Sequence, residues 1–488
     1  MKIAIIGGGP AAVALLDALA VSADEAGARP GPLTVFEPSP WLWRGRPYAP
    51  DLDSVLVNAI PQLMSIRGAD FGHYSGWLGE RGAQYLDTRL GQPLVPRALY
   101  GEYLVESAEA ALAALRGRGW ETRVVRARIT GATRHEGMIV LRTDAGQEHR
   151  VSRLALCVGG GTPPDLYNLA DRPGYIHDPY PLARTLGRIP VDSTVSVLGS
   201  GLTAVDIAVS LAARGHTGPV TLLSRTGTLP HVWQRPIPRT PTQLTGERIS
   251  ALYREQGSVT LADLADLMEA ELADTGESFD DLAAEFLNSD HPVTRLRSQL
   301  EAIDDPRIGR RVLQESVHRL GPSVWPLLPD DDRARLRQHF RTATAIASPM
   351  IPVNAVTVLE MLDTGRLELL RGVRAVESVA GRFRIEHGAG DHTADIVVNA
   401  VNPPPQAIPA GARSLVDALA TAGLAARHPE GGIVPADPCV HIVGDLHGGG
   451  SFITTGIAGL AAQAVFAARA LHGAGGQPRS AAGTRRSA

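Results

Sequence analysis

Two stretches of this 488-residue chain share one uncommon pattern: a short apolar strand, a glycine-rich turn and then a helix. The first stretch is residues 3–12 (IAIIGGGPAA), and the second is residues 194–204 (TVSVLGSGLTA). Glycines at such a turn let the backbone reverse sharply and approach a pyrophosphate, while the first amides of the helix face the anion. The repeated unit predicts an α/β protein with two Rossmann-like dinucleotide-binding domains.

The first unit carries the residue types that dinucleotide binding needs. Gly7 permits the tight turn, Gly9 leaves room for the pyrophosphate, and Ala12 allows close packing of the helix on the strand. Glu37 closes the next predicted strand, where an acid accepts hydrogen bonds from ribose hydroxyl groups. Taken alone, these residues also fit a glycine-rich turn in another kind of α/β protein.

The second unit differs at the end of its second strand, which finishes in Ser224 and Arg225 in place of an acid. An acid there suits the free ribose of NADH, whereas an arginine suits the 2′-phosphate of NADPH. We therefore expect Arg225 to select NADPH. The alternative is a solvated arginine, because Lys2 is the only lysine among 47 basic Lys and Arg residues.

The composition disfavours several classes of protein. A formal charge of −4 and a pI near 6.4 argue against a nucleic-acid-binding protein that relies on a positive field. The two cysteines, Cys157 and Cys439, lie far apart and form neither a CxxC dithiol nor a cysteine zinc motif. Because no run of 18 apolar residues predicts a membrane span, we expect a soluble, cytoplasmic protein without a membrane partner. A homo-oligomer is compatible with the sequence.

The order of the expected elements divides the chain into domains. Residues 1–187 and 405–472 are expected to form the first dinucleotide-binding domain, which is discontinuous. Residues 188–404 are expected to form the second, with a helical insertion at about 240–345 where charged residues are mixed into a Leu/Ala background. Residues 473–488 are typical of a flexible tail.

With Gly444 and Asp445 near the end of the chain, the two units resemble the flavoproteins that have two dinucleotide-binding domains. The resemblance covers about residues 1–235 and 365–471. It implies FAD in the first domain and NADPH in the second, with Asp445 bonding the ribityl or phosphate region of FAD. It also implies that the helix after residues 454–457 points its N-terminus at the flavin, where its partial positive charge stabilises the reduced anion.

A narrower set of motifs resembles a bacterial FAD/NAD(P)-binding family related to the flavin-containing and amino-acid N-hydroxylating monooxygenases. The motifs are residues 44–49 (RGRPYA), 56–65 (LVNAIPQLMS), 175–180 (YIHDPY) and 232–235 (VWQR). Residues 347–352 (ASPMIP) depart from the basic segment usual in that family, so the motifs imply cofactors and leave the substrate open.

The resemblance implies two sets of cofactor-binding residues. The set for FAD is Gly7, Gly9, Pro10, Ala11, Ala12, Glu37, Arg44, Asn58, Met64, Ser65, Gly159, Asp445, Thr455, Gly456 and Ile457. The set for NADPH is Gly199, Gly201, Leu202, Thr203, Ser224 and Arg225.

The reaction implied is oxygen transfer by an FAD- and NADPH-dependent oxidoreductase. Disulfide reductases of this fold need a dithiol beside the flavin, and this chain has none. In a monooxygenase a flavin C4a-hydroperoxide, formed from dioxygen, hydroxylates the nitrogen of a small amine or amino acid. Two alternatives stay open: a reductase or oxidase that passes electrons to a quinone, an iron–sulfur partner or oxygen, and a non-catalytic flavin-binding protein.

Polar side chains in the matching loops are candidates for orienting the substrate and the nicotinamide. Asn58 and Gln234 are the predicted catalytic residues, and the further candidates are Gln62, Ser65, Trp233 and Asn354. Loop packing is the alternative for each. The spacing of His177, His231 and His447 fits no metal motif, so we predict no metal site.

The helical insertion is expected to cover the flavin and to form a dry pocket. It is rich in arginine, including Arg295, Arg297, Arg310, Arg311 and Arg319. Pairing with acids on solvated helix faces would account for any of them. If one or two face inward, they suit a carboxylate-bearing substrate, such as a small amino acid of the aspartate type.

Overall fold

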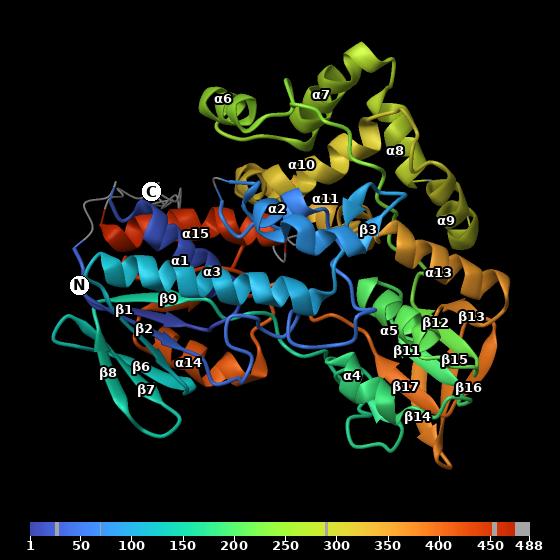
Figure 1. Ribbon diagram of the computed structural model, residues 1–488, viewed down its shortest axis with the longest axis horizontal. Coiled ribbons are helices and arrows are strands. Elements are labelled where there is room, and N and C mark those ends of the chain that lie inside the picture. Colours follow the sequence, from blue (N-terminus) through green and yellow to red (C-terminus); the bar gives the residue numbers. More distant parts are fainter. Residues whose placement is uncertain (25–28, 69, 288–290, 451–455, 474–488) are drawn as a thin grey trace, which may run out of the picture.

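Two five-stranded parallel sheets, at opposite ends of the molecule, carry the two repeated sequence units (Figure 1). The computed structural model describes residues 1–24, 29–68, 70–287, 291–450 and 456–473. The strands of the first sheet are β1 Ile3–Ile6, β2 Pro32–Phe36, β5 Glu121–Val125, β9 Arg153–Leu156 and β20 Val440–Ile442. Their order is β20-β9-β1-β2-β5, and all neighbours are parallel. A parallel sheet needs cover on both faces.

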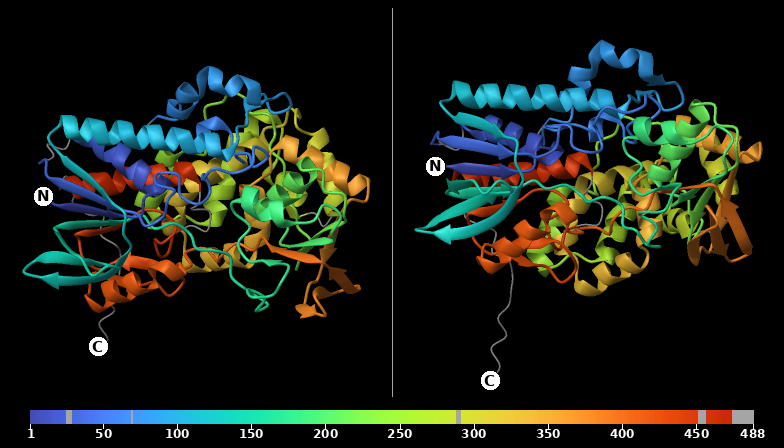
Figure 2. Two further views of the ribbon diagram at one scale, coloured as in Figure 1. Left: turned by 60° about the horizontal axis from the view of Figure 1, so that its bottom comes forward. Right: turned by 90° about the horizontal axis from the view of Figure 1, so that it is seen from below.

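Three helices cover one face of the first sheet: α1 Pro10–Ser22, α3 Arg97–Gly117 and α15 Ile457–His472. Helix α1 packs against both α3 and α15, and the three lie side by side in Figure 1. Residues 11–20 of α1 are all buried, and Asp17, the one charged side chain among them, pairs with Arg67. The other face is covered by α14 Arg413–Thr421 and an antiparallel sheet of β6 Ile129–His135, β7 Met138–Thr143 and β8 Glu148–Val151. Figure 2 shows these strands at the same end of the molecule as the first sheet.

The strands of the second sheet are β10 Tyr175–Ile176, β11 Val195–Leu198, β12 Val220–Ser224, β13 Leu367–Arg371 and β17 Ile396–Asn399. Their order is β10-β17-β11-β12-β13. Helices α5 Leu202–Ala213 and α13 Pro352–Asp363 pack against it. A meander follows, formed by β14 Ala375–Val379, β15 Arg382–His387 and β16 Gly390–Ala394. Strand β10 already belongs to this second sheet, because it pairs with β17. The chain therefore enters the second sheet before residue 187, the position at which the sequence suggests the boundary between the two domains.

A helical insert separates β12 from α13. Its helices are α6 Gly246–Gln256, α7 Leu261–Leu272, α8 Phe279–Leu287, α9 Pro292–Glu301, α10 Gly309–Val324, α11 Asp330–Gln338 and α12 Phe340–Ala347, with η4 Ala273–Thr275 and η5 Trp325–Leu327. The insert has an apolar core of its own. Helix α10 also packs on α15, and α9 packs on α13, so the insert contacts both sheet units (Figure 1).

The segment between β2 and α3 is mostly irregular and is fixed by aromatic packing. The ring centroid of Tyr74 lies 5.0 Å from that of Tyr100 and 4.8 Å from that of Tyr103, both on α3. Its short elements are η1 Pro61–Leu63, α2 His73–Leu78, η2 Gly79–Tyr85, β3 Leu86–Asp87 and β4 Gln92–Pro93.

The remaining elements are α4 Leu182–Thr185, η3 Leu186–Arg188, η6 Ala410–Ala412, β18 Ala425–Arg427 and β19 Ile433–Pro435. Of the helices described, none has the length and apolarity that crossing a bilayer requires.

Candidate functional site

The first glycine turn leaves an open cradle at the start of α1. Gly7 has a φ of +100°, and a Cβ there would lie 2.4 Å from the carbonyl oxygen of Cys157, so only glycine fits. Gly9 is the N-cap of α1, and a Cβ there would meet nothing closer than the Cα of Gly45 at 3.6 Å. The turn therefore offers free space at a helix N-terminus, where backbone amides can bind an anion. The first turn of this helix is formed by Pro10, Ala11 and Ala12.

Glu37 lies at the carboxyl end of β2 and is held by two backbone amides. Gly8 N donates to Glu37 Oε2 and Ser39 N donates to Glu37 Oε1, each over 2.7 Å. A carboxylate has about four acceptor sites, so both oxygens can still accept from hydroxyl groups. The two amides thus fix the orientation of an acid that can bind ribose.

Segments from the end of the chain meet the first turn at the same edge of the sheet. Asp445 Oδ2 would lie 3.2 Å from a Cβ on Gly160, the neighbour of Gly159. Gly444 has a φ of +100°, and a Cβ there would lie 3.6 Å from the Cβ of Ala11. The glycines after β9, the turn after β20 and the start of α1 therefore converge.

The predicted FAD residues at the start of α15 are partly described. Gly456 is the N-cap of α15, and Ile457 is its first, buried residue. Thr454 and Thr455 lie outside the described residues.

The predicted FAD-binding residues Arg44, Met64 and Ser65 also make contacts within the protein. Arg44 Nη1 donates to the Ala98 carbonyl over 2.9 Å, and the Met64 carbonyl accepts from the Tyr100 hydroxyl over 2.8 Å. The Ser65 hydroxyl is buried and donates to the carbonyl of Asp70. These contacts hold the segment between β2 and α3 in place, and a contact of these residues with FAD stays a prediction.

The second glycine turn repeats the geometry of the first. Gly199 has a φ of +125°, and a Cβ there would lie 3.0 Å from the carbonyl oxygen of Ala400. Gly201 is the N-cap of α5, and a Cβ there would have no atom within 4 Å. The first residues of α5 are Leu202 and Thr203. A second cradle is therefore open at the start of α5.

Arginines that are distant in sequence surround the end of β12. Arg225 is exposed and, within the described part of the chain, has no ion pair. Ser224 accepts from Gly227 N over 2.7 Å and lies opposite Arg371 in the sheet register. Burial, and then the charge of Arg225, lowers the pKa of Arg341 on α12. The sequence analysis missed Arg341 and Arg371, because no local pattern ties them to Arg225.

Trp233, which follows β12, packs against the segments that carry Asn58, Gln62 and Asn354. The Trp233 indole Nε1 donates to the carbonyl of Asn58 over 2.9 Å, and the ring packs with Ile60, Leu63 and Ile351. Several polar atoms in these segments are buried and have no hydrogen-bond partner in the described part of the chain, among them Asn58 Oδ1, Gln62 Oε1 and Asn354 Nδ2. A buried polar atom left unpaired costs free energy, so this region fits a ligand that completes the hydrogen bonds.

A buried charge cluster joins the two sheet units beside Asn58. Arg97, at the start of α3, donates from Nη2 to Asp206 Oδ2 on α5 over 2.6 Å. The Tyr180 hydroxyl donates to the same carboxylate oxygen, and Arg97 Nε donates to the carbonyl of Leu56 over 2.9 Å. Burial raises the pKa of Asp206, whereas Arg97, Tyr180 and the side chain of Asn58 oppose the shift. The cluster fixes the loop that carries Asn58 against the second unit.

Comparison with known proteins agrees with this geometry. A family model described as FAD-NAD(P)-binding matches residues 4–161. These residues are an FAD/NAD(P)-binding domain. No curated protein sequence matches the chain.

Solved structures share the whole fold. L-lysine 6-monooxygenase from Pseudomonas syringae aligns with a TM-score of 0.58 at 15% identity, covering 96% of this chain and 99% of that chain. The FAD-bound cadaverine monooxygenase of Erwinia amylovora aligns with a TM-score of 0.54 at 13% identity, covering 96% and 94%. The Kutzneria ornithine N-hydroxylase, solved with reduced FAD, NADP⁺ and L-ornithine, gives 0.52 at 15%, covering 95% and 97%. The predicted fold class, two dinucleotide-binding domains with a helical insert, is confirmed.

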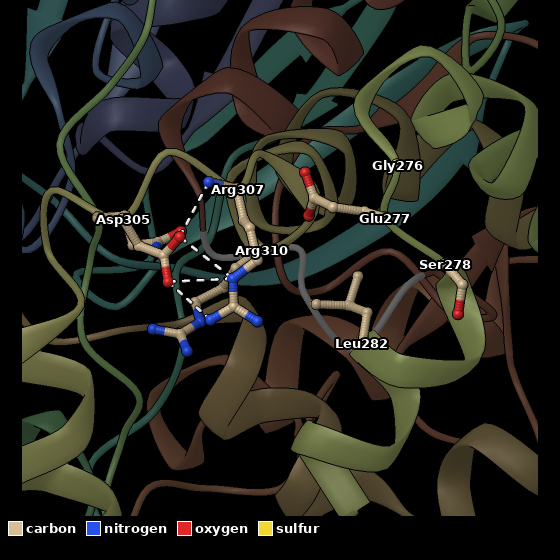
Figure 3. Close-up of a pocket in the computed structure, with 8 residues that line it drawn as sticks. Gly276, Glu277, Ser278, Leu282, Asp305, Arg307 and Arg310 are labelled. Carbon is tan, nitrogen blue, oxygen red and sulfur yellow. Dashed lines mark hydrogen bonds and ion pairs between the residues drawn. The ribbon is translucent and has the colours of Figure 1, made fainter.

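Asn58 belongs to the FAD/NAD(P)-binding domain, whereas the side chain of Gln234 is held by the insert. Its Nε2 donates to the carbonyl of Ala302 over 2.8 Å, and its side chain lines a cavity of about 130 Å³ within the insert. Figure 3 shows the residues that line this cavity: Gly276, Glu277, Ser278, Leu282, Asp305, Arg307 and Arg310. The contact with Asn58 is made by Trp233 instead, so the two predicted catalytic residues lie in different surroundings.

The five arginines singled out in the insert have different environments. Arg310 is buried and lines the cavity, and Arg311 donates to four backbone carbonyls. Arg295 donates to the carbonyl of Leu229. Arg297 pairs with Asp363, and Arg319 pairs with Glu315. Arg310 is thus the arginine that the cavity places where a ligand could reach it.

The three predicted loop histidines do not form a metal site. His231 is buried, its Nδ1 lies 2.8 Å from Gln299 Nε2, and burial lowers its pKa to about 3. Burial also lowers the pKa of His447, and His177 Nδ1 is buried without a hydrogen-bond partner among the described residues. In the described ranges no group of three His, Cys, Asp or Glu side chains could hold a metal ion.

Proposed function

We propose that the protein is an FAD- and NADPH-dependent monooxygenase that hydroxylates the nitrogen of a small amine or amino acid. The observation that carries the proposal is that amide atoms of Asn58, Gln62 and Asn354, in segments that pack on Trp233, are buried without a hydrogen-bond partner among the described residues. Groups of this kind persist where a ligand completes their hydrogen bonds. Structures with the same fold are named as lysine, ornithine and cadaverine oxygenases, which supports the class of reaction.

In this proposal the chain binds, orients and shields the reactants. The turn at Gly7–Ala12 and Glu37 hold FAD, and the turn at Gly199–Thr203 with Arg225 holds NADPH. Bound FAD supplies the hydride acceptor and the site of oxygen activation. Asn58 and Gln62 direct amide groups toward the reacting groups, and Trp233 fixes Asn58 through its backbone.

The two cysteines do not suggest a thiol-based redox reaction as an alternative to the flavin reaction. Burial raises the pKa of the Cys157 thiol, and burial followed by Asp437 raises that of Cys439. Both thiols are therefore protonated and weakly reactive at neutral pH. The redox work falls to the cofactor, and the helices of the insert serve to keep water out.

The insert cavity suits the two charges of an amino acid. Arg307 and Arg310 contribute positive charges to its wall, and Glu277 and Asp305 contribute negative ones (Figure 3). A guanidinium pairs well with a substrate carboxylate, and a carboxylate pairs with an ammonium group. We infer that the substrate is a small amine or amino acid, acidic amino acids included.

Mixing experiments on the purified protein test the proposal. The protein is reduced anaerobically with NADPH, mixed with oxygen and followed by flavin absorbance, first alone and then with a panel of amines and amino acids. We expect one amine to give hydroxylamine or a further oxidised product in proportion to the NADPH consumed. Arg310→Met should raise the KM for a carboxylate-bearing substrate, whereas Arg297→Met, which removes an exposed pair with Asp363, is the control.

The outcomes separate the alternatives. Peroxide release with every amine, together with faster NADPH oxidation when a quinone or ferredoxin is added, would replace the oxygenase by a reductase. Bound FAD that NADPH never reduces would leave a non-catalytic flavin-binding protein.

A further inference from the structure

Gln314 lies on the face of α10 that packs against the segment following β12. Arg311, three residues before it, donates from Nε to the carbonyl of Arg235 over 2.6 Å. His318, four residues after it, stacks on the ring of Trp233, with centroids 5.9 Å apart and an interplanar angle of 25°. Because residues three and four positions apart share one face of a helix, Gln314 lies between these two contacts and faces the same segment.

The protein leaves the amide of Gln314 unsatisfied. The side chain is fully buried, and neither Oε1 nor Nε2 has a hydrogen-bond partner among the residues that the structure describes. Gln234, on the facing segment, is buried as well. Its Nε2 donates to the carbonyl of Ala302, whereas its Oε1 has no partner within the described ranges. Two buried amide oxygens without a donor cost free energy, which a bound group with N–H donors recovers.

Both glutamines are close to the insert cavity. Gln234 lines it, and so does Arg310, which lies one helical turn before Gln314 (Figure 3). A ligand in this cavity of about 130 Å³ therefore has Gln234 in its wall, with Gln314 about 6 Å beyond Arg310 along α10. One small molecule that extends from the cavity along α10 can meet both unpaired oxygens.

The acids of the cavity wall and of α10 already have partners in the protein. They are Glu277, which accepts from the amides of Ile308 and Gly309, Asp305, which pairs with Arg307, and Glu315, which pairs with Arg319. A carboxylate would also keep a nearby amine protonated, and a protonated nitrogen has no lone pair that can be hydroxylated. The nitrogen that reacts is therefore better received by the uncharged amide oxygens.

Two guanidinium groups favour an uncharged amine at Gln314. Arg310 and Arg311 lie on the preceding turn of α10, and both are buried. Burial and a nearby positive charge each disfavour the protonated form of an amine. The same two effects act on His231, where burial, followed by the charges of Arg295 and Arg310, lowers the pKa to about 3. An uncharged primary amine offers two N–H donors and one lone pair.

We propose that Gln234 and Gln314 accept the two N–H groups of the substrate's uncharged amine nitrogen. The inference rests on the proposed function, which makes an amine the ligand of the insert cavity. With both N–H groups donated to amide oxygens, the lone pair points away from the glutamines and stays available for hydroxylation. The pair also selects primary amines, because an uncharged tertiary amine has no N–H to donate.

Binding measurements with matched primary and tertiary amines test the inference. The probes are n-butylamine, 5-aminopentanoate and glycine, each compared with its N,N-dimethyl form by calorimetric titration of the purified, FAD-loaded protein. Gln234→Met and Gln314→Met each remove one amide at similar volume. Gln299→Met is the matched control, because this amide is buried too but is already bonded to the backbone of Val232 and to His231.

The readout is the ratio of the two dissociation constants, tertiary over primary. We expect each hydrogen bond to an amide oxygen to contribute about fivefold, so that the wild type prefers at least one primary amine by about 25-fold. Gln234→Met and Gln314→Met should each lower the ratio to about fivefold. Gln299→Met should lower the thermal stability and keep the wild-type ratio, which separates a structural amide from one that binds the amine.

The outcomes for the inference and for the proposed function are distinguishable. A wild type that binds none of the three primary amines, or binds them no better than the dimethyl forms, refutes the inference. The wild-type ratio in both Gln234→Met and Gln314→Met refutes it as well. If Gln314→Met does not fold, Gln314→Leu replaces it. The expected ratios in a protein that only releases peroxide would retain the amine site and refute the oxygenase.

Discussion

Gly7 and Gly9 belong to one turn, yet a side chain would meet different surroundings at the two positions. A Cβ on Gly7 would collide with backbone at 2.4 Å, whereas a Cβ on Gly9 would have its first contact at 3.6 Å. We therefore expect Gly9→Val to fold but to purify without colour, because the side chain occupies the pyrophosphate position. Flavin absorbance and thermal unfolding followed by circular dichroism check this. Gly76→Ala, which points into open space on α2, is the control, and a yellow Gly9→Val would exclude this turn as the FAD site.

We expect Arg225 to determine the preference for NADPH over NADH. We expect Arg225→Ala to raise the KM for NADPH about 10- to 150-fold, the effect of losing roughly 1.5–3 kcal/mol of charge-assisted contact, and to leave NADH use nearly unchanged. Arg341→Ala should act in the same direction, because its charge lies close to that of Arg225. Arg374→Ala, which removes a pair with Glu386, is the control. An equal rise in KM for NADPH and NADH would show that Arg225 has a structural role. A wild-type protein that prefers NADH would contradict the assignment of NADPH as the cofactor.

We expect His231 to make the free energy of unfolding depend on pH. Burial, with Arg295 and Arg310 adding to it, lowers the pKa of this side chain from 6.5 to about 3. Between these values the unfolded chain binds a proton that the folded protein does not, so the free energy of unfolding falls as the pH drops. We expect His231→Asn, whose amide oxygen can accept from Gln299, to lose less stability between about pH 7.5 and pH 5. Urea unfolding midpoints at pH 7.5 and at pH 5 measure the loss of stability in each protein. An equal loss in the wild type and in His231→Asn would contradict this role of His231.

Among the elements, those with a local signal could be predicted from the sequence. Strand β1 with α1, and β11 with α5, are each encoded by one contiguous run of apolar residues and glycines. Strand β10 has only two residues and joins the second sheet through pairing with β17, which no local pattern reveals. Arg341 could not be predicted for the same reason, because the packing of α12 is set by contacts between distant segments.

Helix α10 depends on a carboxylate from a distant part of the insert. Glu277 accepts from the backbone amides of Ile308 over 2.7 Å and Gly309 over 2.9 Å, at the N-terminus of α10. Removing an acceptor at a helix N-terminus costs about 1 kcal/mol. We expect Glu277→Ala to increase hydrogen exchange in the first turn of α10, measured by mass spectrometry of its peptides. Glu247→Ala, in the exposed first turn of α6, is the control, and unchanged exchange in Glu277→Ala would show that this cap is dispensable.

At the scale of the molecule, the two sheet units are joined by polar contacts along one loop. Arg46 pairs with Asp178, Asp51 accepts from the first amides of α4, and the hydroxyl oxygens of Ser54 and Ser210 lie 2.8 Å apart. The buried pair of Arg97 and Asp206 adds to them, and breaking such a pair by removing one partner costs about 3–5 kcal/mol. These contacts favour one orientation of the two units. The sequence could not show this, because the partners are far apart along the chain.

A reversible cross-link tests whether the proposed reduction by NADPH takes place in this orientation. Ser54→Cys combined with Ser210→Cys places two thiols where the hydroxyl oxygens now lie 2.8 Å apart, a separation compatible with a disulfide. We expect the oxidised double variant to be reduced by NADPH at close to the wild-type rate, because the bond holds the units as the structure has them. Each single variant is a control for the substitution, and dithiothreitol reverses the bond in the same sample. If NADPH reduction stops on oxidation and returns with dithiothreitol, the units must rotate during the reaction, and the orientation described here is one of at least two.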